Sequence, residues 1–238
     1  MAHATFQPIP GQTAVVGSFG SSMDLRETSA LTTRECCEIA EIRLDVVMSD
    51  SGEVDPSQWH HLSVIPLLFT ARRSDEGGAR VLSAARRMEL LKSSLDQAAL
   101  VDIEVASIDE MGAMLDKLKA LGIPWIASFH DFKKLPTTAV LEQAAERAKE
   151  AGAAIFKTAA MLAQPADVSR LAEFQLADHG IPVASMGMGP LAPVSRLLCA
   201  QCGSLLNYGY LGKTTTAPGQ WDALALKQAI SKLAPIAS

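Results

Sequence analysis

Eight short segments rich in valine, isoleucine and leucine recur along the chain, and helical patterns separate most of them. The apolar segments are residues 13–19, 37–47, 65–72, 99–106, 123–132, 153–161, 181–188 and 204–212. Apolar residues recur at helical spacing in 81–91, 107–122, 140–151, 167–177 and 221–233. Ser107 and Glu110 have the spacing of a capping box, and Gly122 is placed to end that helix. Strands that alternate with helices predict a parallel sheet covered by helices.

The number of these segments predicts the α/β class and a closed (β/α)8 TIM barrel, with residues 1–238 forming a single domain. Residues 1–12 are expected to be a flexible or barrel-closing segment. An open, doubly wound sheet is the alternative, because strand number alone does not establish closure. The strand-to-helix turns contain neither G-x-G-x-x-G nor G-x-x-x-x-G-K-[ST], so no motif supports dinucleotide or nucleoside triphosphate binding.

The second segment carries charges where a covered sheet should have none. Glu41, Arg43 and Asp45 alternate with apolar residues, which places the three charges on one face of a strand. In a barrel that face points inward, toward the mouth where the active sites of this architecture lie. The alternative is an internal ion-pair network that binds no ligand, since buried charges must at least be paired.

Composition narrows the class of protein without identifying it. The 238 residues carry a formal charge of -5 with mixed signs, which gives no electrostatic case for a nucleic-acid partner. The first residues lack the features of a secretory signal, and no apolar run is long enough to span a membrane. A soluble, cytoplasmic protein with reduced thiols is expected. The pair Cys199-x-x-Cys202 and the pair Cys36-Cys37 are expected to be buried structural thiols rather than a metal site.

Polar residues cluster at the carboxyl ends of several predicted strands. They are Thr70, Arg72, Glu76, Asp102, Glu104, Ser128, His130, Asp131, Lys157, Ser195 and Arg196. Lys157 lies within a strand that helices should cover, and both burial and nearby arginines would lower its pKa. A neutral amine can attack a ketone to form a Schiff base, for which His130 would move protons and Glu76 would orient the imidazole. This chemistry requires no metal and no organic cofactor.

Seven motifs in one order then carry a resemblance over nearly the whole chain. They are EIRLD (41–45), TARRSDEGG (70–78), DIE (102–104), SFHDF (128–132), FKTA (156–159), MGMG with a following SR (186–196) and APGQ (217–220). Together they resemble type I 3-dehydroquinate dehydratase, the Schiff-base enzyme of the shikimate pathway. The resemblance implies a (β/α)8 barrel that removes water from 3-dehydroquinate to give 3-dehydroshikimate. A homodimer is also implied, because the family often forms one.

The resemblance also implies a role for each matching residue. Lys157 would form the imine, His130 would act as general acid and base, and Glu76 would orient His130. The remaining residues would bind substrate: Glu41, Arg43 and Arg72 the ring hydroxyls, Arg196, Gln220 and Thr216 the carboxylate, and Met186 the ring.

The chain departs from the family pattern in places. Thr216 stands where serine is common. Ala192, beside Pro193, stands where glycine is usual, so strain is expected at Ala192 if that position requires a positive φ. Two other functions remain as alternatives. A Schiff-base aldolase would account for Lys157 but has no need of His130 together with APGQ and Arg196. A non-catalytic binder of a hydroxylated carboxylic acid would account for the pocket, yet no catalytic residue is missing.

Overall fold

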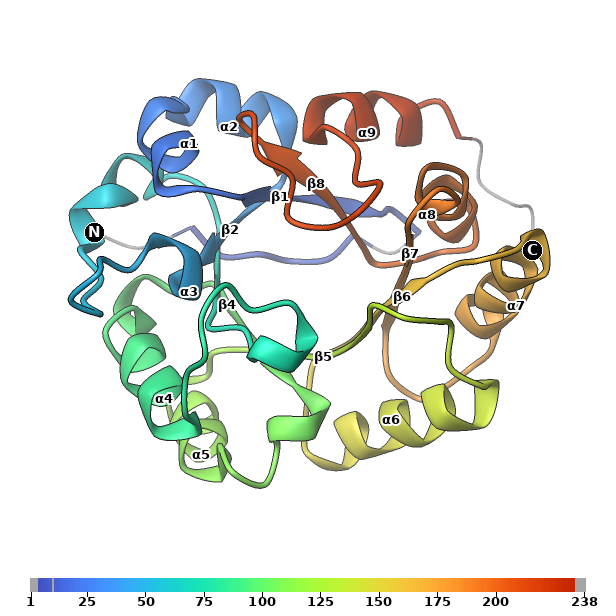
Figure 1. Cartoon of the computed structure of the whole chain (residues 1–238), viewed down its shortest axis with the longest axis horizontal. Helices are drawn as coiled ribbons and strands as arrows, with labels where there is room; N and C mark the ends of the chain where they lie inside the picture. Colours follow the sequence, from blue (N-terminus) through green and yellow to red (C-terminus); the bar gives the residue numbers. More distant parts are fainter. Residues whose placement is uncertain (1–3, 10, 234–238) are drawn as a thin grey trace.

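A computed structural model describes residues 4–9 and 11–233 of the chain. One sheet contains eight parallel strands in the order β7-β6-β5-β4-β3-β2-β1-β8. The strands are β1 (Ala14–Phe19), β2 (Ile39–Arg43), β3 (Leu67–Thr70), β4 (Leu100–Glu104), β5 (Trp125–Asp131), β6 (Ile155–Met161), β7 (Val183–Met188) and β8 (Leu206–Leu211). Helices surround the strands (Figure 1).

The sheet closes into the predicted (β/α)8 barrel. β1 pairs with both β2 and β8, so the strand order follows the chain and places the last strand beside the first. Between β7 and β8 the backbone contact is a hydrogen bond from Leu205 N to Val183 O at 3.0 Å, just before β8 begins. Because β7 and β8 are the two ends of the strand order, this contact nearly closes the ring, with a looser seam between β7 and β8, and excludes a doubly wound open sheet. That the whole chain forms one domain stays a prediction.

The described helices are α1 (Ser22–Glu27), α2 (Ala30–Cys36), α3 (Leu44–Val47), α4 (Ala84–Lys92), α5 (Gly112–Leu121), α6 (Thr138–Glu150), α7 (Pro165–Leu176), α8 (Ala192–Gln201) and α9 (Ala223–Ile230). Five of these described helices, α4, α5, α6, α7 and α9, lie where the sequence predicted a helix, with changed ends, and the other four add to them. Short 3-10 turns lie at Pro56–Gln58, His60–Leu62, Ser74–Glu76, Leu95–Gln97 and Val105–Ser107.

The predicted capping box is wrong, and the predicted helix end is right. α5 begins at Gly112 rather than near Ser107, because the Ser107 hydroxyl is held by Glu110 at 3.0 Å and by Arg87 at 2.9 Å. Gly122 ends α5 with a φ of 66°, a conformation in which a side chain would be strained. Similarly, α4 begins at Ala84, so exposed Val81 lies outside the helix that was predicted to include it.

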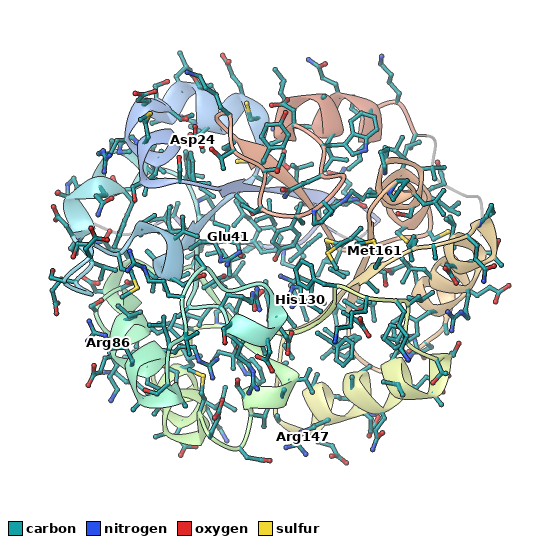
Figure 2. All side chains as sticks on the ribbon, in the orientation of Figure 1. Asp24, Glu41, Arg86, His130, Arg147 and Met161 are labelled. Atoms are coloured by element: carbon teal, nitrogen blue, oxygen red, sulfur yellow. The ribbon has the colours of Figure 1, made fainter. Side chains whose placement is uncertain are left out.

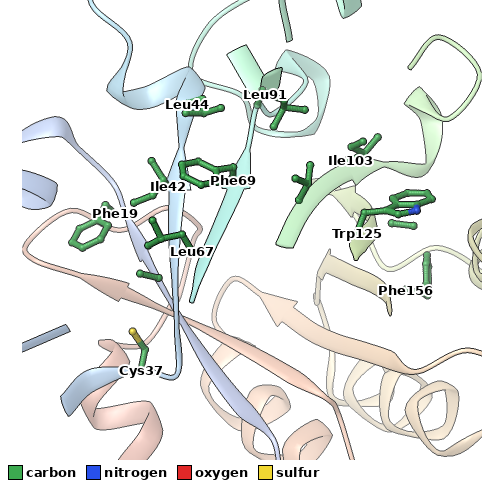
Figure 3. Close-up of a cluster of buried hydrophobic side chains, with 14 of the residues drawn as sticks. Phe19, Cys37, Ile42, Leu44, Leu67, Phe69, Leu91, Ile103, Trp125 and Phe156 are labelled. Carbon is green, nitrogen blue, oxygen red and sulfur yellow. The ribbon is translucent and has the colours of Figure 1, made fainter. Parts of the chain in front are cut away.

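Apolar side chains fill two regions that the sheet separates. The larger cluster lies between the strands and the helices, and Phe69, Trp125 and Phe156 belong to it (Figure 3). The smaller cluster lies inside the barrel, and Phe6 from the amino-terminal segment packs against it. The expectation of a flexible or barrel-closing segment partly falls on residues 1–3 and 10, which lie outside the described residues. The contact of Phe6 favours closure, which stays a prediction.

The cysteines are free thiols in the described chain, and burial raises the pKa of both Cys37 and Cys199 to about 12. Cys36 is also buried, whereas Cys202 is half-buried. Within residues 4–9 and 11–233, no group of three or more His, Cys, Asp or Glu side chains is arranged to hold a metal ion. None of the described helices is long and apolar enough to cross a membrane.

Candidate active site

The barrel interior changes from apolar to polar at a fixed point on each strand. Moving two residues along a strand keeps a side chain on the same face. The inward apolar positions are Val16, Ile39, Leu68, Leu100, Ile126, Ile155, Ala184 and Leu206. Two residues further toward the carboxyl ends stand Ser18, Glu41, Thr70, Asp102, Ser128, Lys157, Met186 and Tyr208. An apolar floor therefore supports a largely polar layer at the mouth.

All ten residues predicted to form the site line one cavity at this mouth. They are Glu41, Arg43, Arg72, Glu76, His130, Lys157, Met186, Arg196, Thr216 and Gln220. Ser18, Gly77, Phe132, Ala159, Met188, Tyr208 and Ala217 complete the lining. Glu41 and His130 lie toward the middle of the molecule, whereas Arg86 and Arg147 lie at its outer edge (Figure 2). Residues from seven strands or the loops after them thus converge on one space.

Lys157 is buried at 3% exposure and is held by two neighbours. Its Nζ lies 2.7 Å from Asp102 Oδ2 and 4.4 Å from the centre of the Tyr208 ring. Burial lowers the pKa of the amine, and the positive charge of Arg72 lowers it further, while Asp102 acts in the opposite direction. The expected direction of this shift is confirmed. The site thus increases the population of neutral amine and fixes its position.

His130 and Glu76 make the contact that the sequence suggested. Glu76 Oε2 lies 2.9 Å from His130 Nδ1 and also accepts a hydrogen bond from the His130 backbone N–H at 2.9 Å. Since Nδ1 is engaged, Nε2 is the ring nitrogen left to exchange protons. Burial lowers the pKa of His130 well below its ordinary value, assisted by the charges of Arg72 and Lys157. Burial also raises the pKa of Glu76 to about 7. The imidazole is therefore neutral near pH 7, which suits a base.

Glycine places Glu76 at this position. Glu76 is the last residue of a 3-10 turn, and Gly77 follows it with a φ of 88°. A Cβ atom at Gly77 would also overlap the ring of Phe132. Gly77 is thus needed both for the turn and for the close approach of Phe132, which directly follows β5.

The other charged side chains at the barrel mouth form a network of ion pairs and hydrogen bonds beside the cavity. Glu41 accepts hydrogen bonds from the hydroxyls of Ser18 and Thr70. Arg72 Nη1 lies 3.0 Å from a carboxylate oxygen of both Asp102 and Glu104. The internal ion-pair network considered as an alternative is therefore present, but it lines a cavity.

Asp45 is a correction to the predicted strand. β2 ends at Arg43, and Asp45 lies in the short helix α3 instead of facing the cavity from a strand. Its carboxylate binds Arg43 Nε at 2.9 Å and Nη2 at 2.7 Å, and accepts the backbone N–H groups of Arg72 and Ala79. These bonds from beyond β3 require Asp45 to leave the strand path, so it holds Arg43 in place.

Arg196 is a buried cation with no acidic partner within residues 4–9 and 11–233. It projects from α8 into the seam between β7 and β8, where Nη1 donates to Tyr208 O at 2.6 Å and lies 3.6 Å from Met186 Sδ. Its Nε atom has no partner among the described residues. Burial without a carboxylate lowers the pKa of Arg196 to about 10. An anion that enters the cavity would satisfy this charge.

The loop after β8 completes the mouth beside Arg196. Gln220 Oε1 accepts hydrogen bonds from both N and Oγ1 of Thr216 at 2.9 Å, which leaves the amide NH2 group for other partners.

The strain expected at Ala192 is absent, because Gly189 takes the positive φ of 80° and no described non-glycine residue has one. Ala192 instead begins α8, which carries Arg196.

Asp102 and Tyr208 are the neighbours of Lys157 to which the sequence assigned no role. Asp102 stood in the DIE motif, and Tyr208 stood in the last apolar segment. The two-residue step from the apolar floor would have found both residues, since each follows an inward leucine by two positions. Their contacts with Lys157 join the strands β4, β6 and β8, and no pattern within one stretch of sequence predicts such contacts.

Comparison with known proteins adds evidence that is independent of this geometry. The family model for type I 3-dehydroquinase matches residues 19–235. The chain belongs to the type I 3-dehydroquinase family. It is therefore an enzyme of the hydro-lyase class, a type I 3-dehydroquinate dehydratase, and the family resemblance drawn from the motifs is confirmed.

Relatives agree in sequence and in fold. The 3-dehydroquinate dehydratase of Methanocella arvoryzae is 33% identical over 208 residues, covering 87% of this chain and 90% of the relative. That of Haloquadratum walsbyi is 32% identical over 224 residues, covering 90% of each. The solved structure of the enzyme from Geobacillus kaustophilus superposes with a TM-score of 0.83, at 23% identity and with 97% of each chain covered. The last comparison supports the barrel fold alone.

Proposed function

We propose that the chain converts 3-dehydroquinate to 3-dehydroshikimate and water through an imine on Lys157, with His130 as the general acid and base. One observation carries this mechanism. A buried amine with a lowered pKa shares a cavity with an imidazole whose Nδ1 is engaged by Glu76. A nucleophile and a proton carrier are the two groups that a Schiff-base dehydration requires.

The charges around the cavity support one orientation of the substrate. Arg196 would bind the carboxylate, because it is the buried cation that no described carboxylate neutralises. The amide NH2 group of Gln220 would donate a further bond, with Thr216 fixing that amide. Glu41, Arg43 and Arg72 would bind the ring hydroxyls on the opposite side, and Met186 would pack against the ring.

The chemical steps then follow in order. The Lys157 amine attacks the C3 ketone, and the carbonyl oxygen leaves as water to give an iminium ion. His130 Nε2 removes a proton from C2, and the electron pair of that C–H bond moves toward the iminium nitrogen. The resulting enamine expels the C1 hydroxyl, which His130 protonates so that it leaves as water. A second water hydrolyses the imine, releasing 3-dehydroshikimate and the free lysine.

The neighbours of Lys157 and His130 also have physical roles in these reaction steps. The iminium ion is the electron sink, so the proposed steps use no metal and no organic cofactor. Asp102 keeps the Lys157 amine in position until the ketone arrives. Glu76 holds the tautomer of His130 in which Nε2 is free.

We further propose that the enzyme acts in the cytoplasm in the shikimate pathway and forms a homodimer.

Removing the proton carrier tests the assignment of His130. His130→Ala should lower kcat by roughly 10²–10⁴-fold, the usual contribution of a general acid–base group, and leave KM changed much less. The measurement follows the absorbance of the conjugated product, with Lys157→Met as the variant that should not turn over. Comparable turnover in His130→Ala would defeat the acid–base assignment.

A further inference from the structure

The loop of residues 212–220 bears two of the proposed substrate ligands, so its position matters to binding. It leaves β8 and returns where Tyr210 N donates to Trp221 O at 2.9 Å. Near its far end, Gly189 N at the end of β7 donates to Pro218 O at 3.0 Å. Thr216 and Gln220 lie between these contacts and line the cavity.

A carboxylate on the segment after the neighbouring strand β1 holds the first half of this loop. Asp24, in α1, is 6% exposed. Its Oδ1 atom accepts a hydrogen bond from Lys213 N at 2.9 Å, and its Oδ2 atom accepts one from Thr214 N at 3.2 Å. Oδ2 also accepts the Ser21 hydroxyl at 2.8 Å. Asp24 lies at the top of Figure 2, beside the chain that leaves β8.

The approach between Asp24 and the loop leaves no space for a side chain. Gly212 has a φ of 82°, and a Cβ atom built on it would overlap the Asp24 carboxyl group. A Cβ atom on Gly20, at the end of the β1 segment, would likewise overlap the backbone of Thr214. Two glycines therefore permit the contact that the Asp24 carboxylate then fixes.

We propose that Asp24 is a positioning residue for substrate binding, which anchors the loop so that Thr216 and Gln220 face Arg196. This inference rests on the proposed function. The carboxylate satisfies two backbone N–H groups, and a charged acceptor makes stronger hydrogen bonds than a neutral one. Without it, the loop occupies the binding position for only part of the time. The apparent affinity for substrate then falls in proportion to that fraction.

The expected signature is a change in KM with little change in kcat. A loop that occupies its binding position one-tenth of the time raises the apparent dissociation constant roughly tenfold. Bound substrate draws the loop back. Lys157 is held by Asp102 and His130 by Glu76, rather than by the loop, so the chemical step at saturation is preserved. Asp24→Asn should therefore raise KM for 3-dehydroquinate roughly tenfold, with kcat within about threefold.

Two variants and two matched controls test this. Asp24→Asn removes the anchor, because the amide NH2 group would face a backbone N–H. Gly212→Ala displaces the same carboxylate from the loop side. Asp167→Asn is the control for the first, since Asp167 also accepts two backbone N–H groups, from Ala163 and Gln164, away from the cavity. Gly203→Ala is the control for the second, because Gly203 has a φ of 86° and open space around its Cβ position.

The steady-state constants and the unfolding midpoint of all four variants decide the matter. If Asp24 anchors the loop, Asp24→Asn and Gly212→Ala should raise KM. The controls Asp167→Asn and Gly203→Ala should lose stability and keep the wild-type KM. Equal KM values in all four, or equal increases in all four, would overturn it, because the contact would then be structural only. If the wild-type enzyme itself neither turns over 3-dehydroquinate nor forms an adduct with it, the proposed function fails instead.

Discussion

Arg196 offers a test in which stability and substrate binding should respond differently to one substitution. Arg196→Met keeps an unbranched apolar side chain in the seam between β7 and β8 but removes the guanidinium. In the free enzyme this cation is buried at 1% exposure, and none of the described carboxylates pairs with it. Removing the guanidinium therefore removes the unfavourable free energy of burying its charge, as well as a favourable hydrogen bond to Tyr208 O.

The magnitudes nearly cancel in the free enzyme. Burial lowers the pKa of Arg196 from its ordinary value to about 10, which corresponds to a cost of about 3 kcal/mol for holding the charge. Against this stands the hydrogen bond from Nη1 to Tyr208 O, which contributes roughly 1.5–3 kcal/mol because the donor is charged. The free energy of unfolding of Arg196→Met should thus stay within about 2 kcal/mol of wild type. The substrate carboxylate loses two charge-assisted bonds, so kcat/KM should fall roughly 10²–10³-fold, mostly through KM.

Arg87→Met is the matched control for stability. Arg87 is buried to a similar degree, but it is paired with Glu104 at 2.8 Å and with Glu110 at 2.5 Å. Removing one partner of a buried pair costs roughly 3–5 kcal/mol. Urea unfolding monitored by fluorescence, together with initial rates over a range of 3-dehydroquinate concentrations, measures both effects. The reasoning would be refuted if Arg196→Met lost as much stability as Arg87→Met and kept the wild-type KM.

Two further predictions concern the surroundings of the Lys157 amine. Tyr208→Phe keeps the ring beneath Nζ and removes a buried hydroxyl that has no partner among the described residues. The free energy of unfolding should therefore rise by about 1 kcal/mol. If urea unfolding instead gave a lower free energy of unfolding for the variant, the hydroxyl would have to be hydrogen-bonded in the wild-type enzyme. The rate of imine formation should rise with pH as the amine loses its proton, and the midpoint should lie below the 10.5 of an ordinary lysine because burial lowers this pKa. Single-turnover rates measure that midpoint, and a value at or above 10.5 would contradict the burial argument.

The sequence predicted those site residues that a period-two pattern places on the inner face of a strand. Glu41 and Lys157 follow an apolar floor residue by two positions, and His130 follows by four, so alternation alone points them inward. Glu76 was proposed from its place on the loop after the third strand. Family motifs then assigned roles to Arg196, Thr216 and Gln220, which lie outside strands and have no such periodicity.

The features that the sequence did not predict depend on contacts between distant segments. Asp45 continued the alternation of β2, and only its bonds to Arg72 and Ala79 take it off the strand path. Ser107 had the spacing of a capping residue, but Arg87 and Glu110 occupy its hydroxyl. Local patterns describe what a segment prefers, whereas these positions were decided by partners that folding brings near.

The contact between Asp24 and its loop is the extreme case, because 189 residues separate it from Lys213. Asp24 occupies the first turn of a helix, where an acidic residue is ordinary and carries no functional signal. Only the closure of the barrel, which places β1 beside β8, brings the two segments together.

The most direct measurement of the central claim is the intact mass of the enzyme after incubation with 3-dehydroquinate and borohydride. Borohydride reduces an imine to a stable amine, so the account predicts a covalent adduct on the wild-type chain and none on Lys157→Met. Peptide mapping should place the adduct on Lys157. A well-folded wild-type enzyme that gives no adduct at saturating substrate would contradict the account, because Lys157 would then not be a nucleophile toward this ketone.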